Sequence, residues 1–232
     1  PSKVSTVSEL KTKVINGLTT YGSSTDINKF GGRFKYSKIL NVIDNIDDAI
    51  TSNITRVRIR RNLKSLTNQF AQYELCYGNK FHINADGKNI KSTGFTIEGQ
   101  TDMLYFTDIP NKNSDGTLDG SGKGVLAIVK GDNELSQGQL IVASAGIVDY
   151  DHGEVIISTV NITSTQRSNN IIEIQAFPES NDVIGLKDLY LSFAVGDSSI
   201  NMVKDTITSG EQISGVGYKV TSSYANGALV RG

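Results

Sequence analysis

The chain has 232 residues, which allows one large domain or two small ones, each with enough core to be stable alone. Hydrophobic residues make up 38% and charged residues 20%, a composition that excludes an intrinsically disordered chain. The single cysteine, Cys76, excludes an internal disulfide framework and a zinc site built from cysteines. No apolar run approaches the roughly 20 residues of a membrane span. The chain starts at Pro1 rather than Met, which is typical of a processed chain or a piece of a longer protein.

The charge is close to neutral overall but unevenly spread. Residues 1–116 carry 16 Lys and Arg against 11 Asp and Glu, whereas residues 117–232 carry 7 against 13. Halves of opposite sign favour self-association or packing between unlike neighbours. An uneven distribution over solvated surfaces explains the same numbers, so both interpretations stay open.

The N-terminal segment is predicted to be an amphipathic helix over residues 7–21. Thr6 and Glu9 have the spacing of a capping box, and Gly22 lies where a left-handed C-cap is expected. The apolar residues recur at spacings of three and four and share one face: Val7, Leu10, Val14, Leu18 and Tyr21.

A second helix is predicted over residues 37–50, with Ser37 as its cap. Its apolar stripe consists of Ile39, Leu40, Ile43, Ile46 and Ile50. A loop containing Gly22, Gly31 and Gly32 joins the two helices, so the front of the chain reads as a helical hairpin.

The remainder is predicted to be mostly antiparallel β structure, because turn signals are frequent and crossover helices are not evident. Residues 148–155 are predicted to form a hairpin, and residues 110–124 a surface loop. The expected fold class is α+β, with residues 1–61 as an interaction element and residues 62–232 as a mainly β region. The Gly- and Ser-rich tail from Ser209 onward is less regular, although Tyr218 and Tyr224 favour its docking on another surface. Strands are expected at 56–60, 70–77, 80–84, 93–98, 103–107, 124–130, 138–148, 153–160, 171–177 and 188–195.

No catalytic, metal or cofactor constellation stands out. His82 and His152 are the only imidazoles, and Cys76 lies within a predicted strand, where an inert thiol is the commoner case. Residues 117–124 lack the hydroxyl residue and following helix of a phosphate-binding loop, and residues 111–122 lack the final Glu of a calcium loop. We therefore expect no catalytic residue, no metal ligand, no cofactor and no small-molecule substrate.

Arg56, Arg58 and Arg60 alternate along one predicted strand, so they project from one face about 6.6 Å apart. Guanidinium groups at this spacing suit carboxylates or phosphates. Three interpretations compete: a solvated face, an ion-pair ladder against an acidic protein neighbour, and a nucleic-acid contact. The third is disfavoured because the chain is not basic overall and no aromatic residues interleave with the arginines.

Residues 33–61 carry a family resemblance. They contain Arg33-Phe34-Lys35-Tyr36-Ser37-Lys38, an Ile43-Asp44 pair, and Ile50-Thr51-Ser52-Asn53 leading into the Arg-bearing strand. In this order the segments resemble the baseplate wedge protein family of T-even-type contractile-tailed bacteriophages, within the broader baseplate J-like family. Weaker likenesses follow at residues 70–74, 90–95, 105–108, 146–156 and 178–182.

The resemblance implies the C-terminal part of a larger structural protein that is not an enzyme. Such a protein forms the inner ring that joins the wedges around the hub and couples baseplate rearrangement to sheath contraction. Its expected partners are a second copy of itself and other wedge proteins, in a homo-oligomer or ring, with no nucleic acid and no membrane. It would be found in the virion tail baseplate, and in the host cytoplasm during assembly.

The expected interface residues come from the two helices and the arginine strand. A competing interpretation is that the helix faces cover the chain's own sheet. From another functional class, the alternative is a receptor- or carbohydrate-binding β-sandwich of a tail fibre, which would need exposed aromatic rings in loops. The interface candidates are Arg56, Arg58, Arg60, Leu10, Val14, Leu18, Ile39 and Ile43.

Overall fold

The computed structural model describes residues 6–131, 138–187, 190–203, 224–225 and 228–229. By its contacts the chain divides into two units, Pro1–Ser198 and Ser199–Gly232. In the second unit, β12 (Tyr224–Ala225) pairs antiparallel with β13 (Ala228–Leu229). The rest of the predicted tail from Ser209, including Tyr218, lies outside the described residues.

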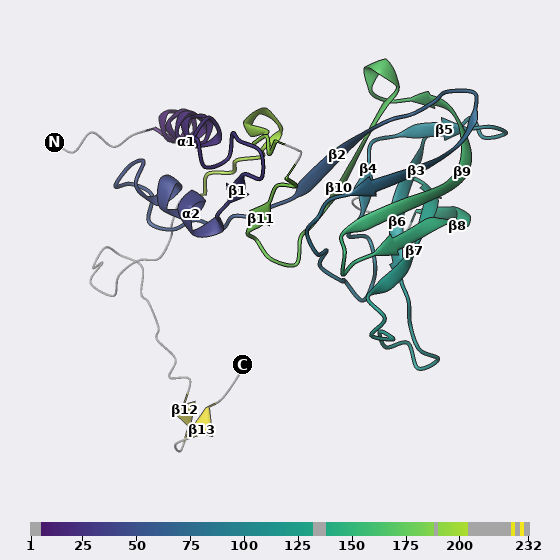
Figure 1. Cartoon of the computed structure of the whole chain (residues 1–232). Coiled ribbons are helices and arrows are strands. Elements are labelled where there is room, and N and C mark those ends of the chain that lie inside the picture. The colour runs from purple at the N-terminus through teal and green to yellow at the C-terminus, as the bar shows by residue number, and fades with distance from the viewer. Residues whose placement is uncertain (1–5, 132–137, 188–189, 204–223, 226–227, 230–232) are drawn as a thin grey trace. The chain divides into compact units, whose positions relative to one another are not determined.

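The first unit is α+β, as expected, and every strand pairing among its described residues is antiparallel. Figure 1 shows its elements in chain order. The helical elements are α1 (Val7–Gly22), α2 (Tyr36–Asp44), η1 (Ser168–Asn170) and η2 (Val195–Asp197). The strands are β1 (Arg33–Phe34), β2 (Ile59–Lys64), β3 (Phe70–Cys76), β4 (Lys91–Ser92), β5 (Phe95–Ile97), β6 (Leu104–Pro110), β7 (Lys123–Lys130), β8 (Gln139–Asp149), β9 (Glu154–Thr165), β10 (Ile171–Ala176) and β11 (Val183–Ile184).

The first helix begins as its sequence predicts. The Thr6 hydroxyl accepts a hydrogen bond from the Glu9 backbone N–H at 3.2 Å, and the Glu9 carboxylate accepts one from the Thr6 backbone N–H at 2.7 Å. The predicted left-handed cap at Gly22 is wrong, because the helix ends through Ser23 with φ −85°. Gly22 instead lies against Phe193, where a Cβ would come within 3.1 Å of the Phe193 Cβ.

The second helix is shorter than predicted and ends at Asp44. Ser37 is not its cap, because the helix begins at Tyr36, whose backbone N–H donates to the Asp182 carboxylate at 2.8 Å. Beyond the helix, the Asp47 carboxylate accepts a hydrogen bond from the Ala49 backbone N–H at 3.0 Å. Short polar side chains that bond to nearby backbone in this way compete with helix hydrogen bonds, which explains the early end.

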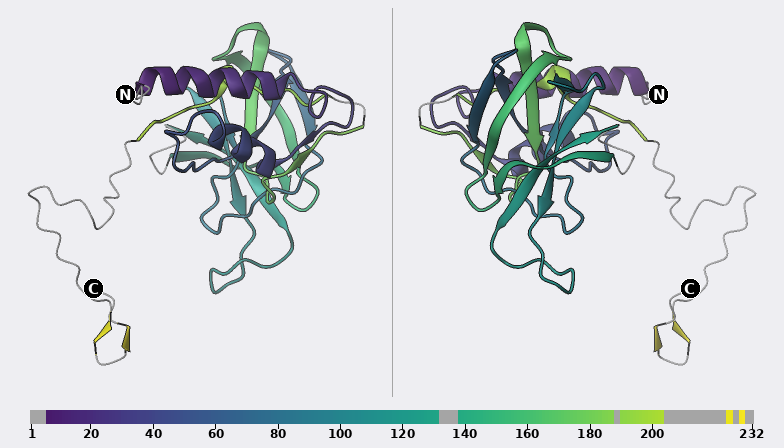
Figure 2. Two further views of the ribbon diagram at one scale, coloured as in Figure 1. Left: turned by 90° about the vertical axis from the view of Figure 1, so that its left-hand side faces the viewer. Right: turned by 90° about the vertical axis from the view of Figure 1, so that its right-hand side faces the viewer.

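The two helices belong to a small lobe, here called the helical lobe, made of α1, β1, α2, β11 and η2. Figure 2 shows α1 and α2 side by side, and α1 also contacts η2. Phe34 and Phe193 stack near Tyr21, with ring centroids 5.8 Å apart. The buried apolar residues of this lobe are Val14, Leu18, Tyr21, Ile27, Phe34, Ile39 and Val183.

Six strands form the main sheet, in the order β3-β9-β5-β6-β7-β8. Because the long strand β9 also pairs with β8, strands β5 to β9 close on themselves into a barrel. The predicted hairpin over residues 148–155 is confirmed, with Asp149 opposite Glu154. The predicted loop over residues 110–124 is found as a surface loop over residues 111–122, because Pro110 belongs to β6 and Lys123 and Gly124 belong to β7.

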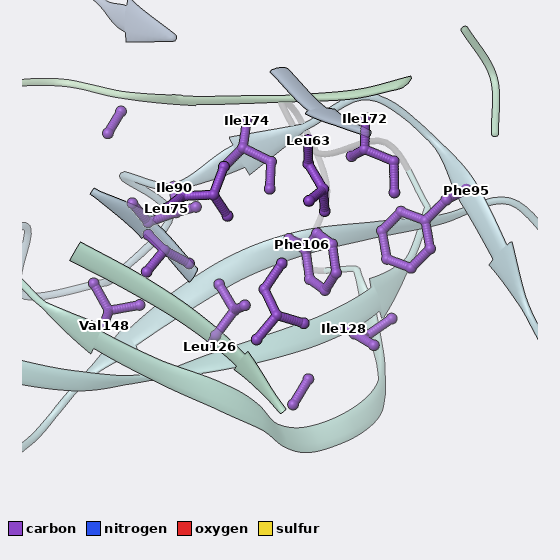
Figure 3. Close-up of a cluster of buried hydrophobic side chains, with 14 of the residues drawn as sticks. Leu63, Leu75, Ile90, Phe95, Phe106, Leu126, Ile128, Val148, Ile172 and Ile174 are labelled. Carbon is purple, nitrogen blue, oxygen red and sulfur yellow. The ribbon is translucent and has the colours of Figure 1, made fainter. Parts of the chain in front are cut away.

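A second sheet of three strands, in the order β2-β10-β4, packs its inner face onto the barrel strands. Leu63, Ile172 and Ile174 from this sheet belong to the same core as Phe95 and Phe106 of the barrel. Figure 3 shows these side chains meeting between the two sheets. The two phenylalanine rings lie 4.3 Å apart at their centroids.

Three strand predictions are corrected. The strand expected at 56–60 begins only at Ile59, because its partner β10 ends at Ala176 and the Phe177 N–H bonds to Asn89 instead. Residues 80–84 form no ladder, since the N–H groups of Phe81 and His82 bond to two different segments. In the predicted strand 188–195, the described residues form only a single bridge and the start of η2.

Candidate protein-contact site

The predicted arginine row is divided by the structure. Arg60 is paired within the chain: its Nη1 lies 2.8 Å from an Asp197 oxygen and 3.5 Å from a Glu173 oxygen. Glu173 also binds Arg167 at 3.0 Å. Arg60 therefore already has the acidic partners that an outside protein was expected to supply.

Arg56 and Arg58 remain exposed, although Arg58 also contacts its own chain. The Arg58 guanidinium lies over the Phe177 ring, 4.8 Å from its centroid, and donates weakly to Gln175 at 3.5 Å. Both arginine residues are exposed, whereas the intervening Val57 is half-buried, as the alternation of the sequence predicts. Arg61 lies on the opposite face of the chain from Arg60 and donates through Nε and Nη2 to the Cys76 carbonyl at 3.0 and 2.6 Å.

The helix residues predicted to face a partner behave in two ways. Val14, Leu18 and Ile39 are buried, with exposed fractions of 2%, 5% and 1%. In this structure they fill the core of the helical lobe. Leu10 and Ile43 are half-buried and lie closer to the surface, and their role in an interface stays a prediction.

A basic surface that the sequence argument did not single out lies on the helical lobe, on the segment that joins α1 to α2 and on the start of α2. It is a hollow of about 240 Å³, here called the basic hollow. The Asp26 carboxylate bonds to Lys38 and also attracts Lys29 and Lys35 at longer range, but among the described residues neither these two lysines nor Arg33 forms a close ion pair. The signal was four cations between residues 29 and 38. Its lining residues are Asp26, Lys29, Gly31, Arg33, Lys35 and Lys38.

The loop that carries this hollow has a backbone fixed by two glycines. Gly31 adopts φ +62°, a left-handed conformation that favours glycine. A Cβ at Gly32 would lie 2.2 Å from the Ile27 carbonyl oxygen, so no larger residue fits there. The Arg33 N–H then donates to the Asp26 carbonyl at 3.0 Å, which closes the loop on itself.

An exposed aromatic pair adjoins the hollow. Phe30 lies in sequence between two lining residues of the hollow, and its ring packs against Tyr190 with centroids 4.1 Å apart. The two rings remain 58% and 54% exposed. Aromatic residues and arginine are enriched at protein–protein interfaces, and this surface presents Phe30, Tyr190 and Arg33.

The barrel carries a different surface, an apolar row across four neighbouring strands. Ile156, Ile147, Val125 and Ile109 are successive cross-strand partners on β9, β8, β7 and β6, so their side chains share one face. Ile147 and Ile109 are 52% and 42% exposed.

Each candidate catalytic side chain contacts a different carboxylate. The His82 ring lies 3.0 Å from Glu179, and the His152 ring lies 3.0 Å from Asp149. The Cys76 sulfur lies 3.7 Å from a Glu154 oxygen. Within the described residues, no group of three or more His, Cys, Asp or Glu side chains is placed to hold a metal ion.

One carboxyl group, that of Asp108, is buried in the barrel. It accepts hydrogen bonds from the Tyr150 hydroxyl at 2.7 Å and from the Ile90 N–H at 2.6 Å. Burial raises the pKa of Asp108, and the hydrogen bonds from Tyr150 and Ile90 oppose that change. Burial beside this carboxyl also raises the pKa of Tyr150. The pair joins β6 to the turn after β8, which is a structural role.

These charged, aromatic and apolar surfaces are of the kinds found at protein–protein contacts. Residues 2–62 match the family model of the baseplate structural protein gp6, C-terminal domain III. The match supports a phage tail baseplate protein, which assembles with other baseplate proteins in the virion. No curated protein matches the chain.

The matched segment contains α1, β1 and α2 but only part of the helical lobe. It also contains the basic hollow and the three arginines of the row. The division of the chain at residue 61 stays a prediction, and the structure adds β11 and η2 to the elements that pack with the helices. None of the helices in the described part of the chain has the length and apolar character of a membrane span.

Proposed function

We propose that this chain is the C-terminal part of a baseplate wedge protein in a contractile phage tail, of the baseplate J-like kind. Its role is structural: it contributes to the inner ring that joins wedges around the hub and couples baseplate rearrangement to sheath contraction. The observation that carries this proposal is the match of residues 2–62 to a baseplate structural domain.

The surfaces of the first unit support a role in assembly. The exposed Arg56 and Arg58, the basic hollow and the apolar row on the barrel are all suited to protein contacts. The partners are other wedge proteins and a second copy of this chain in a closed ring, where one surface patch meets a different patch. The protein has no enzymatic activity in this proposal and assembles in the host cytoplasm before it enters the virion.

Charge reversal in the assembling phage tests the proposal. Arg56→Glu with Arg58→Glu should reduce the yield of complete baseplates, because both guanidinium groups are exposed and lie in the matched segment. The matched control is Lys64→Glu with Lys112→Glu, which makes the same charge change at exposed positions elsewhere. Baseplates are counted by electron microscopy of purified particles, and thermal unfolding of the isolated chain checks the fold.

Locating the chain in the assembled particle gives the direct answer. An electron cryomicroscopy map of the baseplate should contain this fold around the hub, at a wedge-to-wedge contact. Purified virions that lack the chain would contradict the baseplate assignment. A chain found in the baseplate but away from the ring would remove only the inner-ring role.

A further inference from the structure

We propose that the basic hollow and the adjoining pair Phe30–Tyr190 form a docking site for an acidic protein segment that carries an apolar side chain beside its carboxylates. This inference deepens the proposed function, on which it rests, by naming the surface and the chemistry of the partner.

The charge of the hollow is the first argument. Four cations and one carboxylate line it, and that carboxylate already bonds to Lys38. This bond lowers the pKa of Asp26 and raises the pKa of Lys38, so both groups are ionised at neutral pH. The Asp182 carboxylate, which accepts the Tyr36 backbone N–H at 2.8 Å, keeps its negative charge. Four cations thus stand against the two carboxylates Asp26 and Asp182, and this excess of positive charge favours carboxylates from outside.

The size of the hollow is the second argument. At about 240 Å³ it is smaller than the roughly 300–1,000 Å³ of a typical small-molecule pocket. It can accept one or two carboxylate side chains of a neighbouring polypeptide. Charge-assisted hydrogen bonds to Arg and Lys give such contacts both strength and orientation.

The aromatic pair supplies the apolar part of the site. An antiparallel backbone bridge places Phe30 beside Tyr190, and their rings already pack against each other in the free chain. A preformed surface loses little conformational freedom on binding. An apolar side chain that packs on these rings would bury their exposed area next to the bound carboxylates.

Nucleic acid fits the same observations less well. The chain has a net charge of −1 and a sequence pI of about 6.2, whereas nucleic-acid-binding domains are commonly strongly basic. The cations form a local cluster around a hollow and do not continue as a stripe over α1, which ends without a basic residue in its last turn.

The test uses the whole chain and a short peptide of alternating glutamate and leucine as the probe. Nuclear magnetic resonance titration should shift the backbone amides of residues 26–38 and 190. A peptide with glutamine in place of glutamate is the chemical control and should bind about tenfold more weakly or worse, because charged acceptors roughly double the strength of each hydrogen bond.

The variant Lys29→Glu with Arg33→Glu should raise the Kd for the glutamate–leucine peptide by at least about tenfold. The matched control Lys64→Glu with Lys112→Glu should leave the Kd within about twofold, because mutations of distant exposed charges act mainly through weak, screened fields. Tyr190→Ala should weaken binding by a smaller factor without any change of charge. Thermal unfolding of each variant establishes that the lobe is still folded.

Four results would overturn the inference: no binding of the glutamate–leucine peptide, equal binding of the glutamine peptide, equal losses in the two double variants, or preferential binding of a single-stranded oligonucleotide at residues 26–38. None of these results would remove the chain from the baseplate. The docking site and the proposed function therefore fail separately.

Discussion

The helical lobe and the barrel are both built around buried apolar side chains, but their backbones are secured to different degrees. In the barrel, β6 and β7 pair over seven successive residues from Leu104 to Pro110, and the neighbouring strands continue the ladder. In the lobe, β1 and β11 pair over only two residues. Regions with fewer backbone ladders and smaller cores open at lower free-energy cost. We therefore expect the helical lobe, which holds most of the family-matched segment, to open at a lower free-energy cost than the barrel.

The largest effect is expected from Phe106→Ala in the barrel. Phe106 has no exposed surface and packs against Phe95, so its truncation leaves a cavity that should cost about 3–5 kcal/mol of stability. Chemical denaturation measures this loss, and Leu140→Ala, at a position 49% exposed, is the control with a loss below about 1 kcal/mol. Equal losses in the two variants would contradict the burial of Phe106 in the barrel core.

A smaller and more local effect is expected from Ile39→Ala in the lobe. Ile39 is 1% exposed, and its truncation should cost about 2–4 kcal/mol. Hydrogen exchange should show faster exchange in α1 and α2, with β6 and β7 unchanged. Equal acceleration in the barrel would break the comparison, because the two regions would then unfold as one.

The buried carboxyl predicts a pH dependence that belongs to the barrel. Because burial raises the pKa of Asp108 in the folded chain, the folded state keeps this proton to a higher pH than the unfolded state does. The stability contribution of Asp108 is therefore fully present below the unfolded carboxyl pKa of about 3.9 and is lost as the pH rises through the folded pKa.

Asp108→Asn should remove the loss of stability that Asp108 causes as the pH rises. Unfolding free energies measured between about pH 4 and pH 7 should fall less with rising pH in the variant than in the original chain. The quantity to compare is the difference in pH slope between the variant and the original chain. Hydrogen bonds to Thr117 and Ser121 lower the pKa of Asp115 and Asp119, and these two groups change stability with pH in the opposite direction in both chains. Parallel slopes would contradict the buried state of Asp108.

The smallest effect concerns the link between the two regions. Arg60 on β2 binds Asp197 in η2 at 2.8 Å, and the two side chains are 32% and 56% exposed. A double-mutant cycle with Arg60→Ala and Asp197→Ala should give a coupling free energy below about 1 kcal/mol, since exposed ion pairs contribute little. A larger coupling would show that this contact holds the lobe to the three-stranded sheet.

Local sequence patterns predicted the helices and strands that depend on neighbouring residues. The features that the sequence did not predict depend on contacts between residues near each other only in the fold. The capping box at Thr6 and the alternation over residues 70–77 act locally, so α1 and β3 are found where expected. The second helix was predicted too long because the Asp47–Ala49 turn competes with it. The basic hollow was missed because its shape depends on the turn at Gly31, which charge spacing alone does not reveal.

The prediction of interface residues stays open for a related reason. Periodicity shows which face of a helix is apolar but not whether the chain itself covers that face, as it does for Val14 and Leu18. Alternation likewise placed Arg60 on the outer face, but only the fold brings Asp197 beside it.

The pairing of β1 with β11 has a consequence for how the polypeptide matures. Strands β2 to β10 are an insertion between the two halves of the helical lobe, because Phe34 pairs with Val183. During synthesis α1 and α2 leave the ribosome long before η2, which packs against α1 in the folded chain. The helical lobe can therefore complete its packing only after almost the whole first unit has been translated. A fragment limited to residues 2–62 would lack β11 and η2, which pack with β1 and α1.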